Sequence, residues 1–294
     1  MKKIIKEVDD KKGIVQVTIA DERWYLRPAK DAEGKPIIQS VPSVTWISGC
    51  YPKGIAFYKW LADKGWDESE SIKQAAGNKG SKVHLAIADI LQGKEVRIDS
   101  KYLNKASDTL EELTLEECDC ILSFLSWKES VKPKVIAWET VVFSEQHNFA
   151  GTVDFICEIN DEYWIIDFKT SQYIWAEYEL QISAYRKAIE NGENNFPQVD
   201  PSKIKTAILQ LGYRRNKNNY KFTEIENKFE LFKAAQTIWK NEHSEEVPNK
   251  KDYPIILSPA TSAEQVIENV EKNEKQSSVN EAGRNTAKVK TRRA

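Results

Sequence analysis

Two aspartates and a lysine stand where a protein normally keeps apolar side chains. Asp154 lies in the run GTVDFICEI, and Asp167 and Lys169 lie in WIIDFKTS. Both runs read as strands packed against a core, where an unpaired charge is strongly unfavourable. The runs are close in the sequence, so we expect neighbouring strands that carry both carboxylates to the same edge of a sheet. The sequence therefore predicts an oxygen-rich pocket at that edge.

This pocket has the chemistry of a divalent-metal site. Two close carboxylates repel each other unless a cation lies between them, and oxygen ligands of this kind suit Mg²⁺ or Mn²⁺. Lys169 follows Asp167 by two residues, so it projects from the same face of the strand. Its ammonium group can then reach a water molecule on the metal or an anionic transition state. The combination predicts metal-dependent hydrolysis.

Four further residues are candidates for the same site, and each has a structural alternative. His84 lies on an apolar helix face, where it is either a metal ligand or a satisfied core histidine. Glu139 lies on the strand before Asp154, where it either joins the site or is simply solvated. Gln181 and Tyr185 share one helix face, yet alone they read as a surface residue and a core residue. Only in combination with the two aspartates do Gln181 and Tyr185 indicate an active-site role.

A basic and aromatic segment near residues 213–222 is a candidate for DNA contact. It contains Arg214, Arg215, Lys217 and Lys221, interleaved with Tyr213, Tyr220 and Phe222. Such a segment can follow a phosphate backbone and stack on bases. A solvated hairpin tip has the same composition, so both interpretations stay open.

The elements around these residues predict an α/β fold with a mixed sheet flanked by helices. An alternating pattern predicts an N-terminal β-hairpin over residues 14–27. After it the sequence predicts helices near 52–65, 79–91 and 108–131, strands over 134–143, 151–159 and 163–170, a helix over 176–192, a hairpin over 203–226 and a helix over 227–243. The carboxylates of the acidic helix near 108–131 are expected to form a solvated face.

Composition narrows the class of protein. The chain has 294 residues, 40% of them hydrophobic, and nine tryptophans, so it can bury a core and is not a disordered protein. Its net charge is only −2, so any affinity for nucleic acid must come from local patches. No apolar run reaches membrane-spanning length. The cysteines lack CxxC spacing, so we expect free thiols in a reducing cytosol and a soluble, unexported protein.

Three segments are expected along the chain. Residues 1–39 form the hairpin extension, residues 40–261 carry the candidate site, and residues 262–294 form a polar, disordered tail. The tail is basic at its end, where the last eleven residues contain no acid but contain Arg284, Lys288, Lys290, Arg292 and Arg293.

Together the motifs resemble the RecB-like branch of the PD-(D/E)XK nuclease superfamily. Asp154 and the Asp167-x-Lys169 pair match the signature in its relaxed form, and Gly151 supplies the Gly-x-x-Asp that this branch commonly has where other members have proline. Two further pieces also match, namely GSKVH with His84 and Gln-x-x-x-Tyr with Gln181 and Tyr185. These pieces are specific in combination, whereas Asp-x-Lys alone is weak.

The N-terminal part carries a second resemblance. The PSVT stretch at residues 42–45 and the helix of Trp60 resemble phage RecB-like nucleases and mitochondrial genome-maintenance exonucleases. The likeness therefore spans about residues 40–245. It adds Ser43 and Thr45 to the expected DNA contacts.

The resemblance implies a restriction-endonuclease-like core, with a central mixed β-sheet, an N-terminal hairpin and an arch of helices. It implies that His84, Asp154, Asp167 and the backbone carbonyl of Phe168 hold Mg²⁺ or Mn²⁺, while Lys169 assists the attacking water. It further implies that Gln181 and Tyr185 orient their helix and the DNA strand, with Glu139 as a secondary candidate. The cysteine spacing does not match the iron–sulfur cluster of some relatives, so no cluster is expected.

The resemblance favours a Mg²⁺-dependent DNA exonuclease of phage or prophage recombination, replication or repair. A structure-specific or restriction-like endonuclease on the same core is the nearest alternative, and a non-catalytic DNA-binding scaffold is an alternative of another class. The expected partners are DNA, single-stranded or with free ends, and a protein that anneals or binds single strands. The expected location is the cytoplasm of a bacterial host cell, without a membrane partner.

Overall fold

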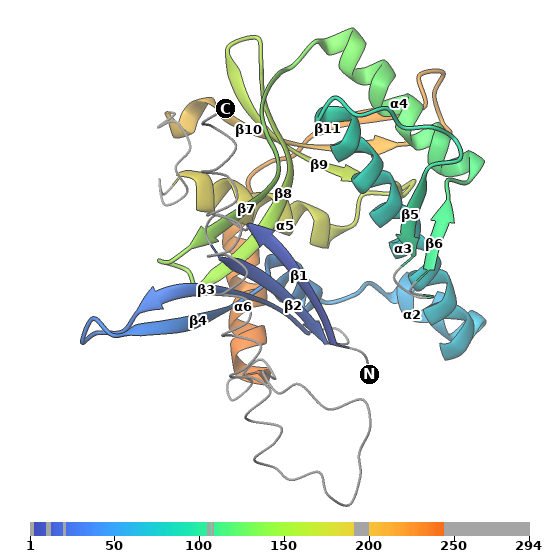
Figure 1. Ribbon diagram of the computed structural model, residues 1–294. Coiled ribbons are helices and arrows are strands. Elements are labelled where there is room, and N and C mark those ends of the chain that lie inside the picture. Colours follow the sequence, from blue (N-terminus) through green and yellow to red (C-terminus); the bar gives the residue numbers. More distant parts are fainter. Residues whose placement is uncertain are drawn as a thin grey trace, which may run out of the picture. The chain divides into compact units, whose positions relative to one another are not determined.

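A five-stranded mixed sheet carries the predicted acids (Figure 1). In the computed structural model its order is β11-β10-β9-β8-β7, and only β9 and β10 are parallel. The strands are β7 (Lys134–Ser144), β8 (Phe149–Ile159), β9 (Glu162–Lys169), β10 (Ile204–Leu211) and β11 (Tyr220–Glu224). The predicted run of three strands followed by a later hairpin is confirmed. The structure describes residues 3–9, 13–19, 22–104, 107, 109–190 and 200–243.

The central strand explains why an acid is buried there. All residues of β9 from Trp164 to Phe168 are buried, as expected for a strand that neighbours cover on both faces. Ile165 belongs to one apolar core and Ile166 to the other. Asp167 therefore stands in the middle of the sheet and not at a wet edge.

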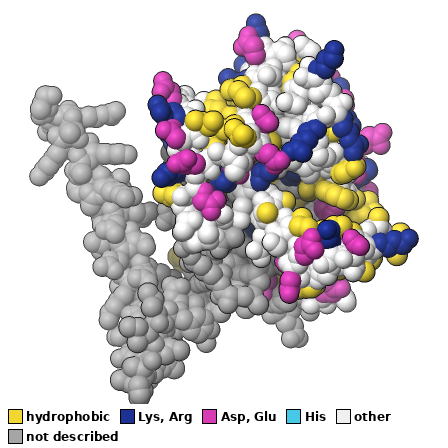
Figure 2. All heavy atoms as spheres, turned by 90° about the vertical axis from the view of Figure 1, so that its right-hand side faces the viewer, with side chains coloured by type: hydrophobic (Ala, Val, Ile, Leu, Met, Phe, Trp, Pro, Cys, Tyr) yellow, Lys and Arg dark blue, Asp and Glu magenta, His cyan; other side chains and the backbone are white. Residues whose placement is uncertain are grey.

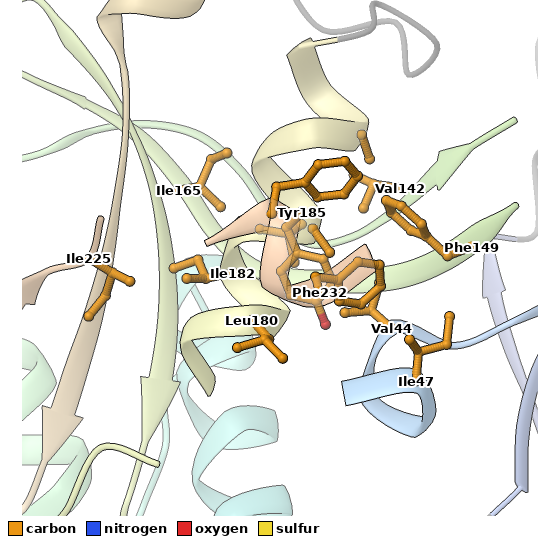
Figure 3. Close-up of a cluster of buried hydrophobic side chains, with 14 of the residues drawn as sticks. Val44, Ile47, Val142, Phe149, Ile165, Leu180, Ile182, Tyr185, Ile225 and Phe232 are labelled. Carbon is orange, nitrogen blue, oxygen red and sulfur yellow. The ribbon is translucent and has the colours of Figure 1, made fainter. Parts of the chain in front are cut away.

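Helices cover both faces of the sheet. One core lies beneath α1 (Val44–Gly49), α5 (Ala176–Glu190) and α6 (Phe229–Glu242), where Val44, Phe149 and Phe232 pack together (Figure 3). The other core lies beneath α3 (Trp66–Leu91) and α4 (Leu115–Val131). The mixed sheet flanked by helices is the fold class that the sequence predicts.

The predicted N-terminal hairpin is confirmed, but it belongs to a larger sheet. Strands β2 (Ile14–Ile19) and β3 (Glu22–Lys30) pair with β1 (Lys3–Asp9) and β4 (Pro36–Pro42) in a four-stranded antiparallel sheet. The hydroxyl groups of Tyr25 on β3 and Thr152 on β8 are 2.9 Å apart. This second sheet is thus joined to the strand that carries Asp154.

Two helices differ from the prediction in where they begin. The helix α2 (Ile55–Lys64) ends before Gly65 as predicted, but α3 begins at Trp66 and not near residue 79. The early turns of α3 are mostly exposed, so they lack the apolar stripe that marks its later turns. Likewise α4 begins only at Leu115, because the preceding strand β6 (Thr109–Glu112) pairs with β5 (Lys101–Asn104).

The expected solvated face of the acidic helix is wrong for Glu117. This side chain is buried, and its carboxylate lies 3.0 Å from the ammonium of the buried Lys82 on α3. It also accepts a hydrogen bond from the backbone of Thr114, which closes a capping box at the start of α4. The charge pair fixes α3 against α4 two residues before His84.

The predicted tail over residues 262–294 lies outside the described residues. Cys50, Cys118, Cys120 and Cys157 have free thiols. Among the helices that the structure describes, none has the length and apolar character needed to cross a membrane.

Candidate active site

Asp154 and Asp167 lie where β8 and β9 separate. The last antiparallel pair of the two strands is Phe155 with Ile166, and the two aspartates follow directly beyond it. There the backbone N–H of Phe168 donates a hydrogen bond to Asp154 Oδ2 at 2.8 Å. The main chain of β9 thereby holds the carboxylate of β8 in place.

Asp167 and Lys169 form a buried ion pair beside Asp154. Lys169 Nζ lies 2.5 Å from Asp167 Oδ2 and 4.7 Å from the ring centre of Tyr178 on α5. Burial raises the pKa of Asp167 to about 6, although Lys169 opposes the shift. Asp167 Oδ1 is buried and has no hydrogen-bond partner among the described residues. This oxygen is available to a cation.

His84 connects the acids to the main chain. Its Nδ1 lies 3.3 Å from Asp154 Oδ1 and 3.8 Å from Glu139 Oε1, and its Nε2 lies 3.1 Å from the carbonyl oxygen of Phe168. Burial lowers the pKa of His84, but Asp154 and Glu139 outweigh it and raise the pKa to about 9. Without an ion, a charged imidazolium therefore holds these acceptors together.

Glu139 reaches the site through an unusual backbone conformation. It lies on β7 between the pairs Trp138–Phe155 and Thr140–Val153, with a φ of 44°. A non-glycine residue in this region of φ costs about 1 to 3 kcal/mol and persists only where its surroundings enforce it. Ligand atoms of His84, Glu139 and Asp154 all lie within 4.8 Å of one another. The structure thus places Glu139 among the candidate ligands, where sequence reasoning had ranked it second.

Gln181 and Tyr185 are linked on the inner face of α5. Gln181 Nε2 donates a hydrogen bond of 2.7 Å to the Tyr185 hydroxyl, and the Tyr185 ring is buried. A Cβ atom on Gly151 would lie 2.3 Å from Tyr185 Cε1. Gly151 is therefore required because the tyrosine ring packs directly on the backbone of β8. Burial also raises the pKa of Tyr185 well above its usual value, which keeps the hydroxyl neutral.

A family model agrees with this arrangement. The model described as the PD-(D/E)XK nuclease superfamily matches residues 56–260, which include all the site residues described above. The chain belongs to the PD-(D/E)XK nuclease superfamily. A search of curated proteins found no match.

Membership in this superfamily gives the chain its class of activity. A PD-(D/E)XK nuclease cuts nucleic acid, so this chain is a hydrolase that acts on DNA. Its five-stranded mixed sheet with helices on both faces agrees with the core of that superfamily. The RecB-like affinity, by contrast, rests on the sequence motifs alone.

The donor set of this nuclease fits a divalent cation of the Mg²⁺ and Mn²⁺ class. Nucleases of the superfamily generally use one of these ions, and both prefer oxygen ligands. The carboxylates of Glu139, Asp154 and Asp167 together with the ammonium of Lys169 sum to a charge of −3 + 1 = −2. A divalent ion balances that charge once His84 is neutral. The orphaned Asp167 Oδ1 is the oxygen that most needs such a partner.

The four basic residues that are expected to contact DNA differ in their partners. Arg214 pairs with Glu116 on α4, and Arg215 donates a hydrogen bond of 2.7 Å to the Tyr173 hydroxyl. Lys217 is exposed, and Lys221 Nζ lies 5.7 Å from the ring centre of Tyr213. All four remain on the surface, where they could meet a phosphate backbone.

The two residues of the PSVT stretch differ from each other. Ser43 is buried, and its hydroxyl oxygen accepts a hydrogen bond from the Trp46 backbone at 3.1 Å. It is therefore the N-cap of α1, and its contact with DNA stays a prediction. Thr45 is exposed, so its contact with DNA stays a prediction.

Proposed function

We propose that this nuclease is a Mg²⁺- or Mn²⁺-dependent DNA exonuclease. The observation that carries the proposal is the meeting of His84, Glu139 and Asp154 within 4.8 Å beside the buried Asp167–Lys169 pair. His84, Asp154, Asp167 and the Phe168 carbonyl would hold the ion, with Glu139 as an additional ligand. When bound, such an ion polarises a scissile phosphate and activates water for attack.

The residues of the chain supply orientation and charge. Lys169 is held by Asp167 and Tyr178, so its ammonium is fixed in place before DNA binds. A preorganised cation of this kind stabilises negative charge that develops on the phosphate. Gln181 and Tyr185 fix α5 against β8, which sets the distance between that helix and the acids.

Support for an exonuclease comes from the helices that precede the sheet. The helix α2 has no buried residue, and Tyr58 is 53% exposed whereas Trp60 is half-buried. Trp66, the first residue of α3, is 70% exposed. The exposures of Tyr58 and Trp66 favour base stacking over the core role that either aromatic side chain would otherwise have. Figure 2 shows hydrophobic side chains exposed among Lys, Arg, Asp and Glu side chains on the face at the right of Figure 1. An unpaired base stacked on an aromatic ring contributes about 1 to 3 kcal/mol, so this face suits a single strand.

The biological setting is proposed from the sequence motifs. Their likeness to phage nucleases supports a role in phage or prophage recombination, replication or repair. The proposed location is then the cytoplasm of the bacterial host, with a protein that anneals or binds single strands as the partner.

A covalently closed single-stranded DNA circle tests the requirement for an end. We expect the nuclease to degrade the linear form in Mg²⁺ and to leave the circle intact, because helices α2 and α3 would arch over the site and admit only a threaded strand. The measurement is a time course on labelled linear and circular DNA of the same sequence, repeated with EDTA. Rapid cutting of the circle would replace the exonuclease with the endonuclease alternative, and no metal-dependent cutting at all would favour the scaffold.

Replacing Arg214 and Arg215 together by alanine tests the basic hairpin. If these side chains follow the DNA backbone, the double variant should bind all sequences more weakly, and the slope of log K against log salt should fall by about one to two units. Cleavage of bound DNA should survive. The matched control is Lys30→Ala with Lys35→Ala, an equal loss of charge on β3 and the β3–β4 turn (Figure 1). An unchanged slope would return the arginines to the solvated-surface interpretation.

A further inference from the structure

A second group of ligand atoms lies outside the active site, at the meeting point of α1 and α6. Cys50 is the C-cap of α1, Glu242 is the last residue of α6, and His243 is the C-cap of α6. Their Sγ, carboxylate and imidazole ligand atoms all lie within 4.8 Å of one another. No residue of this group belongs to the cluster around Asp154.

We propose that Cys50, Glu242 and His243 bind a Zn²⁺ ion. A thiolate, an imidazole and a carboxylate are the three kinds of side chain that bind Zn²⁺, whereas the thiolate disfavours Mg²⁺ and Ca²⁺. Tetrahedral ligands with bonds of about 2.0 to 2.3 Å stand about 3.5 Å apart. A contraction of about 1 Å would therefore close the present set around an ion. Among the described residues these three side chains are the ligands available, which leaves a fourth position for water.

Aromatic packing holds the imidazole in this place. The His243 ring centre lies 4.9 Å from that of Trp46 on α1 and 5.6 Å from that of Trp239 on α6. The two tryptophans also contact each other, with ring centres 5.0 Å apart. Cys50 Sγ lies 3.9 Å from the carbonyl oxygen of Trp46, its hydrogen-bond acceptor. The imidazole is thus fixed between two tryptophans, one of which lies on the helix that ends at Cys50.

Electrostatics favour a cation at this end of α6. The C-terminus of a helix carries partial negative charge from its unpaired carbonyl groups. Glu242 adds a full negative charge at that point. A bound Zn²⁺ would neutralise both charges and would connect α1 with α6. Such an ion would hold these two helices together and would be separate from the hydrolytic centre.

Cobalt substitution tests the site without any use of DNA. The full chain, freed of metal and kept in excess Mg²⁺, is titrated with Co²⁺, and the thiolate-to-cobalt charge-transfer band is recorded. We expect one equivalent of Co²⁺ to produce the band and Zn²⁺ to abolish it. Cys50→Ser should remove the band, while Cys118→Ser, which alters another half-buried thiol, should keep it. Glu242→Gln changes an exposed side chain and removes a proposed ligand. Mutating a residue that only hydrogen-bonds to a metal ligand weakens metal binding by about 10- to 100-fold, so this change should weaken Zn²⁺ binding by more than that.

Stability gives an independent readout. In excess Mg²⁺, Zn²⁺ should raise the melting temperature of the His84→Ala variant but not that of the double variant Cys50→Ser with His84→Ala, because an ion that binds only the folded state stabilises it. Absence of the band in the wild type would overturn the zinc site, as would its persistence in Cys50→Ser. Since His84→Ala leaves these ligands in place, failure of the nuclease proposal would not affect this result.

Discussion

Asp167→Asn and Lys169→Met should each abolish DNA cleavage while leaving the fold intact. Lys169→Met removes a preorganised ammonium beside the reacting phosphate, which should lower kcat by about 10²- to 10³-fold. Asp167→Asn removes a candidate metal ligand and the partner of Lys169 at once, so its loss should be at least as large. Single-turnover cleavage of end-labelled DNA in Mg²⁺ measures both effects, and circular dichroism checks the fold.

The two variants should differ in metal affinity. Calorimetric titration with Mn²⁺ should show weaker binding to Asp167→Asn, because a negatively charged oxygen ligand is lost. Lys169→Met should bind Mn²⁺ at least as well as the wild type, because a nearby positive charge is gone. Asp161→Asn, an exposed aspartate between β8 and β9, is the matched control and should be fully active. Wild-type turnover in a well-folded Asp167→Asn or Lys169→Met would move the active site elsewhere.

Gly151→Ala should destabilise the protein by about 1 to 3 kcal/mol, the usual range for forcing an extra carbon into a packed core. The new Cβ would lie 2.3 Å from Tyr185 Cε1, and the buried ring is tied to Gln181 by a hydrogen bond. Because Gly151 is three residues before Asp154, a shift of the ring or of β8 should also reduce cleavage. Urea denaturation and DNA cleavage of the same preparations measure the two losses.

A double-mutant cycle separates this clash from a general effect of alanine on a strand. Tyr185→Leu removes the ring atoms nearest Gly151, so adding Gly151→Ala to it should cost much less than adding the same change to the wild type. Gly77→Ala in α3 is the control, since its Cβ would meet nothing within 4 Å. That change should stabilise the helix by up to about 1 kcal/mol. Equal costs of Gly151→Ala in both backgrounds would mean that Tyr185 is not the obstacle.

The sheet and the positions of its acids follow from local patterns. Apolar runs predict the three strands, and the two aspartates are recognised as site residues because they interrupt those runs. The interval between Asp154 and Asp167 is short, so a tight connection had to bring them to adjacent strands, and the two fall directly after the last β8–β9 pair. Predictions of this kind succeed where the relevant contact is between strands that neighbour each other in sequence.

Other features depend on contacts that no local pattern contains. The positive φ of Glu139 is imposed by the sheet around it, and nothing in AWETV marks it. The Lys82–Glu117 pair joins two helices, so each charge alone reads as surface. Likewise the early turns of α3 are mostly exposed, so no apolar stripe in the sequence marks where this helix begins. Glu139 could have been ranked higher only from its expected place opposite Asp154.

The parallel pairing of β9 with β10 determines when the sheet can be completed during synthesis on the ribosome. Strand β9 ends at Lys169, but its partner β10 is complete only at Leu211, after the whole of α5. At about 5 to 20 residues per second, a ribosome needs about 2 to 8 s for that interval. During this time the apolar strand with Asp167 has one open edge, which attracts chaperones or other unfinished chains. A truncation before Leu211 would leave this edge open for good, and we expect it to yield an aggregating product.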